Sequence, residues 1–213
     1  MRKFLFIFIA ILAYLVLSSK SCSSDEQEES ARNDAELAKT RVSIKNEFES
    51  DDLSKKSLKA FEIKARQELV DFSDYLCICS NKQLDSSFRT QARRMIRDMF
   101  ITDSVRINGL LIDGQDKKIV PLIELLDFNA AGNITSMDLK FDDIKLTEPL
   151  RKTGEFNYKG RLAFSRNVKT FTASDSSIYS PARMEAEIYA SKVFKAFGKD
   201  TLQVWSVFLG DIK

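Results

Sequence analysis

The C-terminal part of the chain, residues 134–212, alternates between apolar and polar positions in the way that half-buried β-strands do. Three apolar residues share one side of the first predicted strand: Met137, Leu139 and Phe141. After Asp143 the apolar phase shifts to Ile144, which predicts a β-bulge that bends the strand. The strand is expected to end at 148–150, since Pro149 cannot donate to a β-ladder.

Three more strands are predicted after this break: 155–168, a strand from Arg183 with a second bulge near Lys192, and 201–212. A loop over 172–181 and a turn at 198–200 separate them. Gly160, in the middle of the second strand, suggests a bend or the close approach of another backbone. Connections this short favour antiparallel neighbours, so the pattern predicts a bent meander whose apolar face needs a cover from upstream.

The cover is predicted to be helical. From Ser54 onward apolar residues recur at spacings of three and four, which places them on one helix face: Leu58, Phe61, Ala65, Leu69, Phe72, Leu76 and Cys79. A second helix is expected from Asp85, with its apolar residues at Phe88, Ala92, Met95, Ile96 and Met99. A short strand over 104–108 and a third helix over 118–128 complete the predicted elements.

Three helices with a short strand among them and a bent meander behind resemble the cone-shaped α+β fold of the nuclear-transport-factor-2-like superfamily. The resemblance covers 54–213, and 99–105 is similar to the stretch that joins helix to strand in that family. A cystatin-like helix-on-sheet fold is the alternative. The resemblance implies a pocket between the helices and the concave sheet, in dehydratases, isomerases, binding domains and secretion-channel domains alike, so it constrains function weakly.

The N-terminal residues 1–21 have the layout of a signal peptide, with a cationic head and an apolar run too short for a comfortable membrane span. Small residues and Cys22 at its end resemble a bacterial lipoprotein precursor, in which that cysteine is lipidated. Ser19 and Lys20 depart from the usual motif. Residues 22–53 are polar and acidic and predict a tether, similar to those that hold lipoproteins at the outer membrane. The alternatives are an uncleaved N-terminal anchor and a cleaved, secreted form.

The composition excludes several kinds of chemistry. The chain has no histidine, which removes the Ser-His-Asp triad, the Cys-His pair and histidine-ligated zinc or haem. Three cysteines cannot form a closed zinc site, and no phosphate-binding glycine motif is present, so no metal and no cofactor is expected. Lys plus Arg total 33 against 31 for Asp plus Glu, which gives no reason to expect a nucleic-acid partner.

Two groups of residues are candidates for binding. Four aromatic residues would line an apolar pocket if the cone is open, or fill an ordinary core if it is not: Phe156, Tyr158, Phe164 and Trp205. Three arginines at four-residue intervals, with Arg94 beside them, form a basic stripe on the second helix: Arg89, Arg93 and Arg97. The stripe would dock an acidic partner or anionic headgroups, although such stripes are commonly solvated helix faces.

Redox and acid-base roles are disfavoured. Cys77 and Cys79 are two apart on a helix and do not face each other, which favours buried free thiols over a redox pair. Four groups offer carboxylate or phenol chemistry inside a cone: Asp103, Asp113, Tyr158 and Tyr75. A turn position for Asp103 and a half-buried strand position for Tyr158 favour structural roles, so no catalytic residue is assigned.

The sequence therefore predicts a non-enzymatic binding or scaffold domain of a bacterial lipoprotein in the cell envelope, anchored to the outer membrane through Cys22 and facing the periplasm or the surface. The expected partners are the membrane, an envelope protein or a small apolar ligand, and a second copy of the chain. Two alternatives stay open: an N-terminally anchored component of a secretion or conjugation assembly, and a small isomerase or dehydratase that uses a carboxylate in the cone.

Overall fold

A computed structural model describes residues 50–108, 119–131, 135–197 and 200–213, which belong to a compact unit from Ser50 to Lys213. The predicted signal peptide, Cys22, the tether up to residue 49 and Asp113 lie outside the described residues. The helices and strands are α3 (Lys55–Ser80), α4 (Ser86–Met99), β1 (Arg106–Ile107), β2 (Val120–Pro121), α5 (Leu122–Ala131), β3 (Ser136–Gly154), β4 (Asn157–Phe171), β5 (Ser176–Phe197) and β6 (Asp200–Ile212). No described helix is long and apolar enough to cross a membrane.

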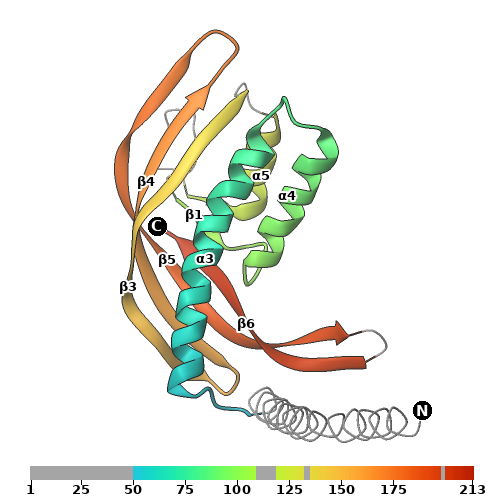
Figure 1. Cartoon of the computed structure of the whole chain (residues 1–213), viewed down its shortest axis with the longest axis vertical. Helices are drawn as coiled ribbons and strands as arrows, with labels where there is room; N and C mark the ends of the chain where they lie inside the picture. The colour runs from blue at the N-terminus through green and yellow to red at the C-terminus, as the bar shows by residue number, and fades with distance from the viewer. Residues whose placement is uncertain (1–49, 109–118, 132–134, 198–199) are drawn as a thin grey trace, which may run out of the picture. The chain divides into compact units, whose positions relative to one another are not determined.

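One six-stranded sheet forms the back of this unit, in the order β2-β1-β6-β5-β4-β3. The long strands β3 to β6 are antiparallel neighbours, which confirms the predicted meander. Strand β1 is parallel to β6 and pairs with it through Ile107 and Ile212, and β2 extends this edge. The α+β class and the order of elements agree with the resemblance found in the sequence (Figure 1).

The helices α3, α4 and α5 lie together on one face of the bent sheet (Figure 1). Ser54 caps α3, because its hydroxyl accepts the Ser57 N–H at 3.1 Å, and Asp85 caps α4 by accepting the Ser87 N–H at 2.7 Å. The predicted apolar face of α3 packs on the core, with Leu58 and Phe61 partly buried at its start. On α4, Phe88 is exposed, while Ala92, Ile96 and Met99 are buried.

Strand β3 is longer than predicted and does not end at Pro149. As an edge strand it loses no ladder bond at the proline, and the next N–H, that of Leu150, donates to Glu62 Oε1 on α3 at 3.0 Å. The bulge near Asp143 is confirmed by a register shift and a φ of 54°. Gly160 is confirmed as a close approach, because a Cβ there would lie 2.8 Å from the Glu148 carbonyl oxygen.

Two other boundaries differ from the prediction. Strand β5 begins at Ser176, inside the predicted loop, because its Ser-rich start pairs with the end of β4 at Phe171. The second bulge is not near Lys192, where pairing with β6 is continuous, but between Ala186 and Ile188. The third helix begins at Leu122 rather than at residue 118, since Val120–Pro121 pairs with β1.

Aromatic side chains fill the space between α3 and the sheet. Phe72 of α3 contacts Phe100 edge-on at 5.0 Å between ring centroids, and Phe141 of β3 lies 4.6 Å from Phe164 of β4. Phe164 is 1 % exposed. Of the four predicted pocket residues, Tyr158 and Trp205 belong to the hydrophobic core together with Phe164, and Phe156 is partly buried against it.

Candidate functional site

The surface of α4 carries an open pocket of about 460 Å³. Six residues of α4 and the loop after it line this arginine pocket: Thr90, Arg93, Arg94, Arg97, Asp98 and Asp103. A helix brings residues three and four apart to the same side, so Thr90, Arg94 and Arg97 line one flank. The helix periodicity in the sequence therefore accounts for most of the pocket, and Asp103, in the loop after α4, supplies the rest of its lining.

Two of the arginines are held by carboxylates. Arg97 Nε donates to Asp103 Oδ1 at 3.0 Å, and its second nitrogen contacts Oδ2, which makes a bidentate pair. Arg93 pairs with Asp127 of α5. The hydrogen bond from Arg97 lowers the pKa of Asp103, and the same bond raises the pKa of Arg97. Both partners stay charged near neutral pH, so this pair holds a geometry and does not transfer a proton.

The three arginines of the predicted stripe do not share one site in the structure, because they line two neighbouring cavities. Arg89 lines a smaller neighbouring cavity of about 160 Å³ with Cys79 and Leu126, and its buried Nε has no hydrogen-bond partner among the described residues. Arg93 borders both cavities. Arg94 is exposed, and within the described chain no ion pair involves it. Judged by the described residues, the unpaired cation in the arginine pocket is therefore Arg94, which lies beside the predicted stripe of Arg89, Arg93 and Arg97.

A second cluster gathers at the end of the sheet where β4, β5 and β6 lie next to one another. Tyr158 of β4 and Trp205 of β6 meet edge-on at 5.6 Å between ring centroids, on either side of β5, where Ala190 is paired with Tyr158 and Lys192 with Trp205. Lys192 of β5 lies over the rings of Phe156 and Trp205. We call Tyr158, Lys192 and Trp205 the clamp.

The clamp holds the four residues that lead into α3, Ser50–Leu53. Trp205 Nε1 donates to the Ser50 carbonyl oxygen at 3.1 Å, and the Leu53 N–H donates to the Tyr158 hydroxyl at 3.1 Å. The Tyr158 hydroxyl in turn donates to Asp52 Oδ1 at 3.2 Å. Two of the predicted pocket residues, Tyr158 and Trp205, thus contact the chain itself.

Charges complete this attachment. Lys192 Nζ lies 2.9 Å from Asp51 Oδ1, with the lysine side chain only 4 % exposed, and Lys152 pairs with Asp52. The hydrogen bond from Lys152 lowers the pKa of Asp52. The acidic residues just before α3 could be recognised in the sequence, but their lysine partners lie 100 and 141 positions away and only the fold brings them together.

The remaining candidates have structural surroundings. Cys77 and Cys79 are free thiols, of which Cys79 is buried as predicted and Cys77 is half-buried. Burial raises the pKa of Cys77, and it raises that of Cys79 to about 11, so neither favours the reactive thiolate. Asp103 is exposed and paired with Arg97, Tyr158 belongs to the clamp, and Tyr75 packs against the core. Among the described residues no group of three or more His, Cys, Asp or Glu side chains is placed to hold a metal ion.

Comparisons with known proteins add little. No protein-family model matches the chain, and no curated protein is similar to it. Among solved structures, a putative scytalone dehydratase from Novosphingobium aromaticivorans DSM 12444 is 6 % identical with a TM-score of 0.35, covering 73 % of this chain and 89 % of that one. The Kfla4162 protein from Kribbella flavida is 10 % identical with a TM-score of 0.32, covering 71 % and 95 %. At these scores neither protein assigns a family or an activity to this chain.

Proposed function

We propose that this protein is a non-enzymatic binding domain of the bacterial cell envelope, held at a membrane by lipid on Cys22. Its arginine pocket receives a carboxylate-bearing segment of a protein partner. The single observation that supports this role is the pocket of about 460 Å³ lined by Arg93, Arg94 and Arg97, in which Arg94 is exposed.

The chemistry of the pocket favours an acidic ligand. Pockets for small apolar ligands are lined mainly by hydrophobic and aromatic side chains, whereas this one is lined by charged groups and a threonine. The bidentate contact of Arg97 with Asp103 is the geometry in which a guanidinium recognises a carboxylate. Arg94 would recognise a carboxylate of the partner in the same way.

The clamp supports the tethered arrangement. The predicted tether included Ser50–Leu53, but the structure fastens these four residues to the sheet through side chains of β4, β5 and β6, so the tether ends at residue 49. A force on the tether would thus act on the sheet before it reaches α3. The candidate carboxylate for an enzyme, Asp103, is exposed and paired, which favours binding over acid-base chemistry.

The membrane attachment is tested by metabolic labelling with palmitate in a bacterial host. We expect the full chain to incorporate label and Cys22→Ser to lose it, with Cys77→Ala as the control that keeps it. Label retained in Cys22→Ser would overturn the lipid anchor. An unlabelled protein that stays with the membrane would indicate an uncleaved N-terminal anchor instead.

The pocket is tested with a fluorescent poly-glutamate peptide, measured by anisotropy against the full chain in detergent. Arg94→Glu should weaken binding at least tenfold, and rising salt should weaken the wild type, because exposed charges are screened. Arg66→Glu, an exposed arginine on α3, is the matched control. Equal binding by both variants would exclude the pocket, and binding to phosphatidylglycerol vesicles without peptide binding would indicate a headgroup site.

A further inference from the structure

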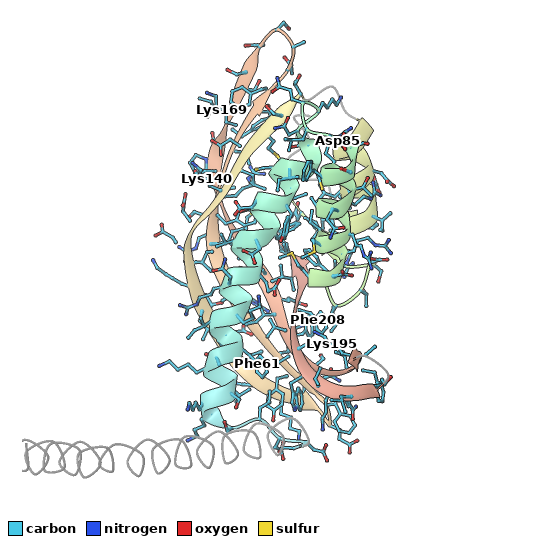
Figure 2. The ribbon with its side chains drawn as sticks, turned by 45° about the vertical axis from the view of Figure 1, so that its right-hand side comes forward. Phe61, Asp85, Lys140, Lys169, Lys195 and Phe208 are labelled. Carbon is cyan, nitrogen blue, oxygen red and sulfur yellow. The ribbon has the colours of Figure 1, made fainter. Side chains whose placement is uncertain are left out.

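The strand β6 has an open edge along most of its length. On the side away from β5, β1 pairs with it only through Ile107 and Ile212, and Phe100 forms an isolated bridge with Leu209. From Asp200 to Phe208 no strand within the described residues pairs with this side. The β5–β6 hairpin, on which Figure 2 labels Lys195 and Phe208, projects beyond the helices.

The backbone groups that face outward can be assigned. The Ile101 N–H donates to the Leu209 carbonyl oxygen at 3.0 Å, so Leu209 faces the open side. Pairing with β5 is continuous from Asp200 to Leu209, and the backbone direction alternates with a period of two along a strand. The N–H and C=O groups that face outward without a strand partner therefore belong to Thr201, Gln203, Trp205 and Val207.

The residues along the open edge of β6 favour pairing with another β-strand. Residues 201–210 carry no charge, and Leu202 is 52 % exposed. Edge strands in monomers are usually protected by charges, prolines or bulges. The opposite edge of the same sheet, β3, has all three, since it contains Pro149, a bulge at Asp143 and several lysines.

We propose that two copies of this chain pair through β6, antiparallel, around a two-fold axis at Val204. Gln203 then lies opposite Trp205 of the second copy and Thr201 opposite Val207, which forms about eight backbone hydrogen bonds. The pairing ends before Leu209, whose carbonyl oxygen is already bonded to Ile101. It joins two six-stranded sheets into one.

A second copy fits this edge because the edge is complementary to itself. An isologous contact places the same surface on both sides, so a charged strand would oppose like charges, and this one does not. Leu202 falls opposite Ser206, with Val204 and Phe208 of the other copy as diagonal neighbours that cover its exposed side chain. The contact is small, and we expect a dissociation constant on the order of micromolar.

The test uses sedimentation velocity of the full chain in detergent over a range of concentrations. We expect a monomer–dimer equilibrium that Gln203→Pro shifts to monomer, because the lost N–H faces outward and proline is tolerated there. Unfolding curves check that this variant folds. A monomer at every concentration, or a dimer that Gln203→Pro leaves unchanged, would overturn the proposal.

Cross-linking tests the register independently of the proline variant. In the Cys22→Ser background, Val204→Cys places two thiols at a non-hydrogen-bonded pair, about 4.5 Å apart between Cα atoms, where a disulfide can form. Leu202→Cys is the matched control, since it is more exposed but lies opposite Ser206. We expect a disulfide dimer only with Val204→Cys. Equal cross-linking of both variants, or of neither, would refute the two-fold axis at Val204.

Discussion

The aromatic residues of the clamp and the arginines of the pocket were both predicted from the sequence as candidates for binding, and the fold gave them opposite surroundings. Tyr158 and Trp205 are buried and bound to Ser50–Leu53. The arginine pocket is open, and Arg94 in it is exposed. The difference teaches that aromatic residues on a concave sheet are readily used by the chain itself, whereas an exposed arginine on an outer helix face, such as Arg94, is open to a partner even where its neighbours Arg93 and Arg97 are paired. Changes in the clamp should therefore alter stability, and changes in the pocket should alter binding.

The largest expected effect is that of Trp205→Ala. It removes a side chain that is 5 % exposed, its contact with Tyr158 and its bond to Ser50, and we expect a loss of about 3–5 kcal/mol in the free energy of unfolding. Urea denaturation measures the loss. Ile178→Ala, at a site that is 78 % exposed, is the control and should change little. A similarly small loss in Trp205→Ala would mean that the segment is not fastened at this point.

The reactivity of Cys79 measures how far solvent reaches the smaller cavity next to α4. Burial raises the pKa of Cys79 to about 11, so at pH 8 its thiolate fraction, and with it the rate of alkylation, should be about a hundredfold below that of a thiol with pKa 9. Peptide mapping after iodoacetamide treatment measures the rate, with the urea-unfolded chain as the reference. The rate should rise as the pH approaches 11. Rapid alkylation at pH 8 would show that the smaller cavity opens to solvent.

A more modest effect is expected of Tyr158→Phe. The change leaves the Leu53 N–H without its acceptor, which should cost about 1–2 kcal/mol in the free energy of unfolding. Hydrogen exchange should quicken at Leu53 in particular. Tyr75→Phe is the matched control, because it lies about 30 Å further along α3. Equal losses of unfolding free energy in both variants would mean that the hydrogen bond between Leu53 and Tyr158 contributes nothing particular to stability.

The smallest effect on stability is expected of Arg97→Gln. The change breaks the pair with Asp103, whose two side chains are about half exposed, and exposed pairs commonly contribute nothing measurable. The urea midpoint should stay unchanged while binding of the poly-glutamate peptide weakens. A shifted urea midpoint with unchanged peptide binding would mean that Arg97 contributes to stability, as the clamp does, and not to binding in the arginine pocket.

The local elements follow from residues close together in the sequence. The sequence predicted the starts of α3 and α4 to within a residue, because Ser54 and Asp85 are strong helix caps whose partners lie two or three positions away. Alternation predicted the meander, the bulge near Asp143 and the close approach at Gly160. The predicted end of β3 at Pro149 and the predicted start of β5 after Ser176 were wrong. Pairing with β4 extends both strands beyond the limits that their own residues suggest.

The amino-acid sequence by itself determined the α+β class, the antiparallel meander, the burial of Cys79 and the place of the arginines on one helix. Each of these depends on spacing within one element, which a period of two or 3.6 residues fixes. Only the tertiary structure decided that Tyr158 and Trp205 hold Ser50–Leu53, that Asp103 lines the arginine pocket, and that β6 keeps an open edge. Contacts between positions up to 155 residues apart depend on how the elements pack, and no local pattern records them.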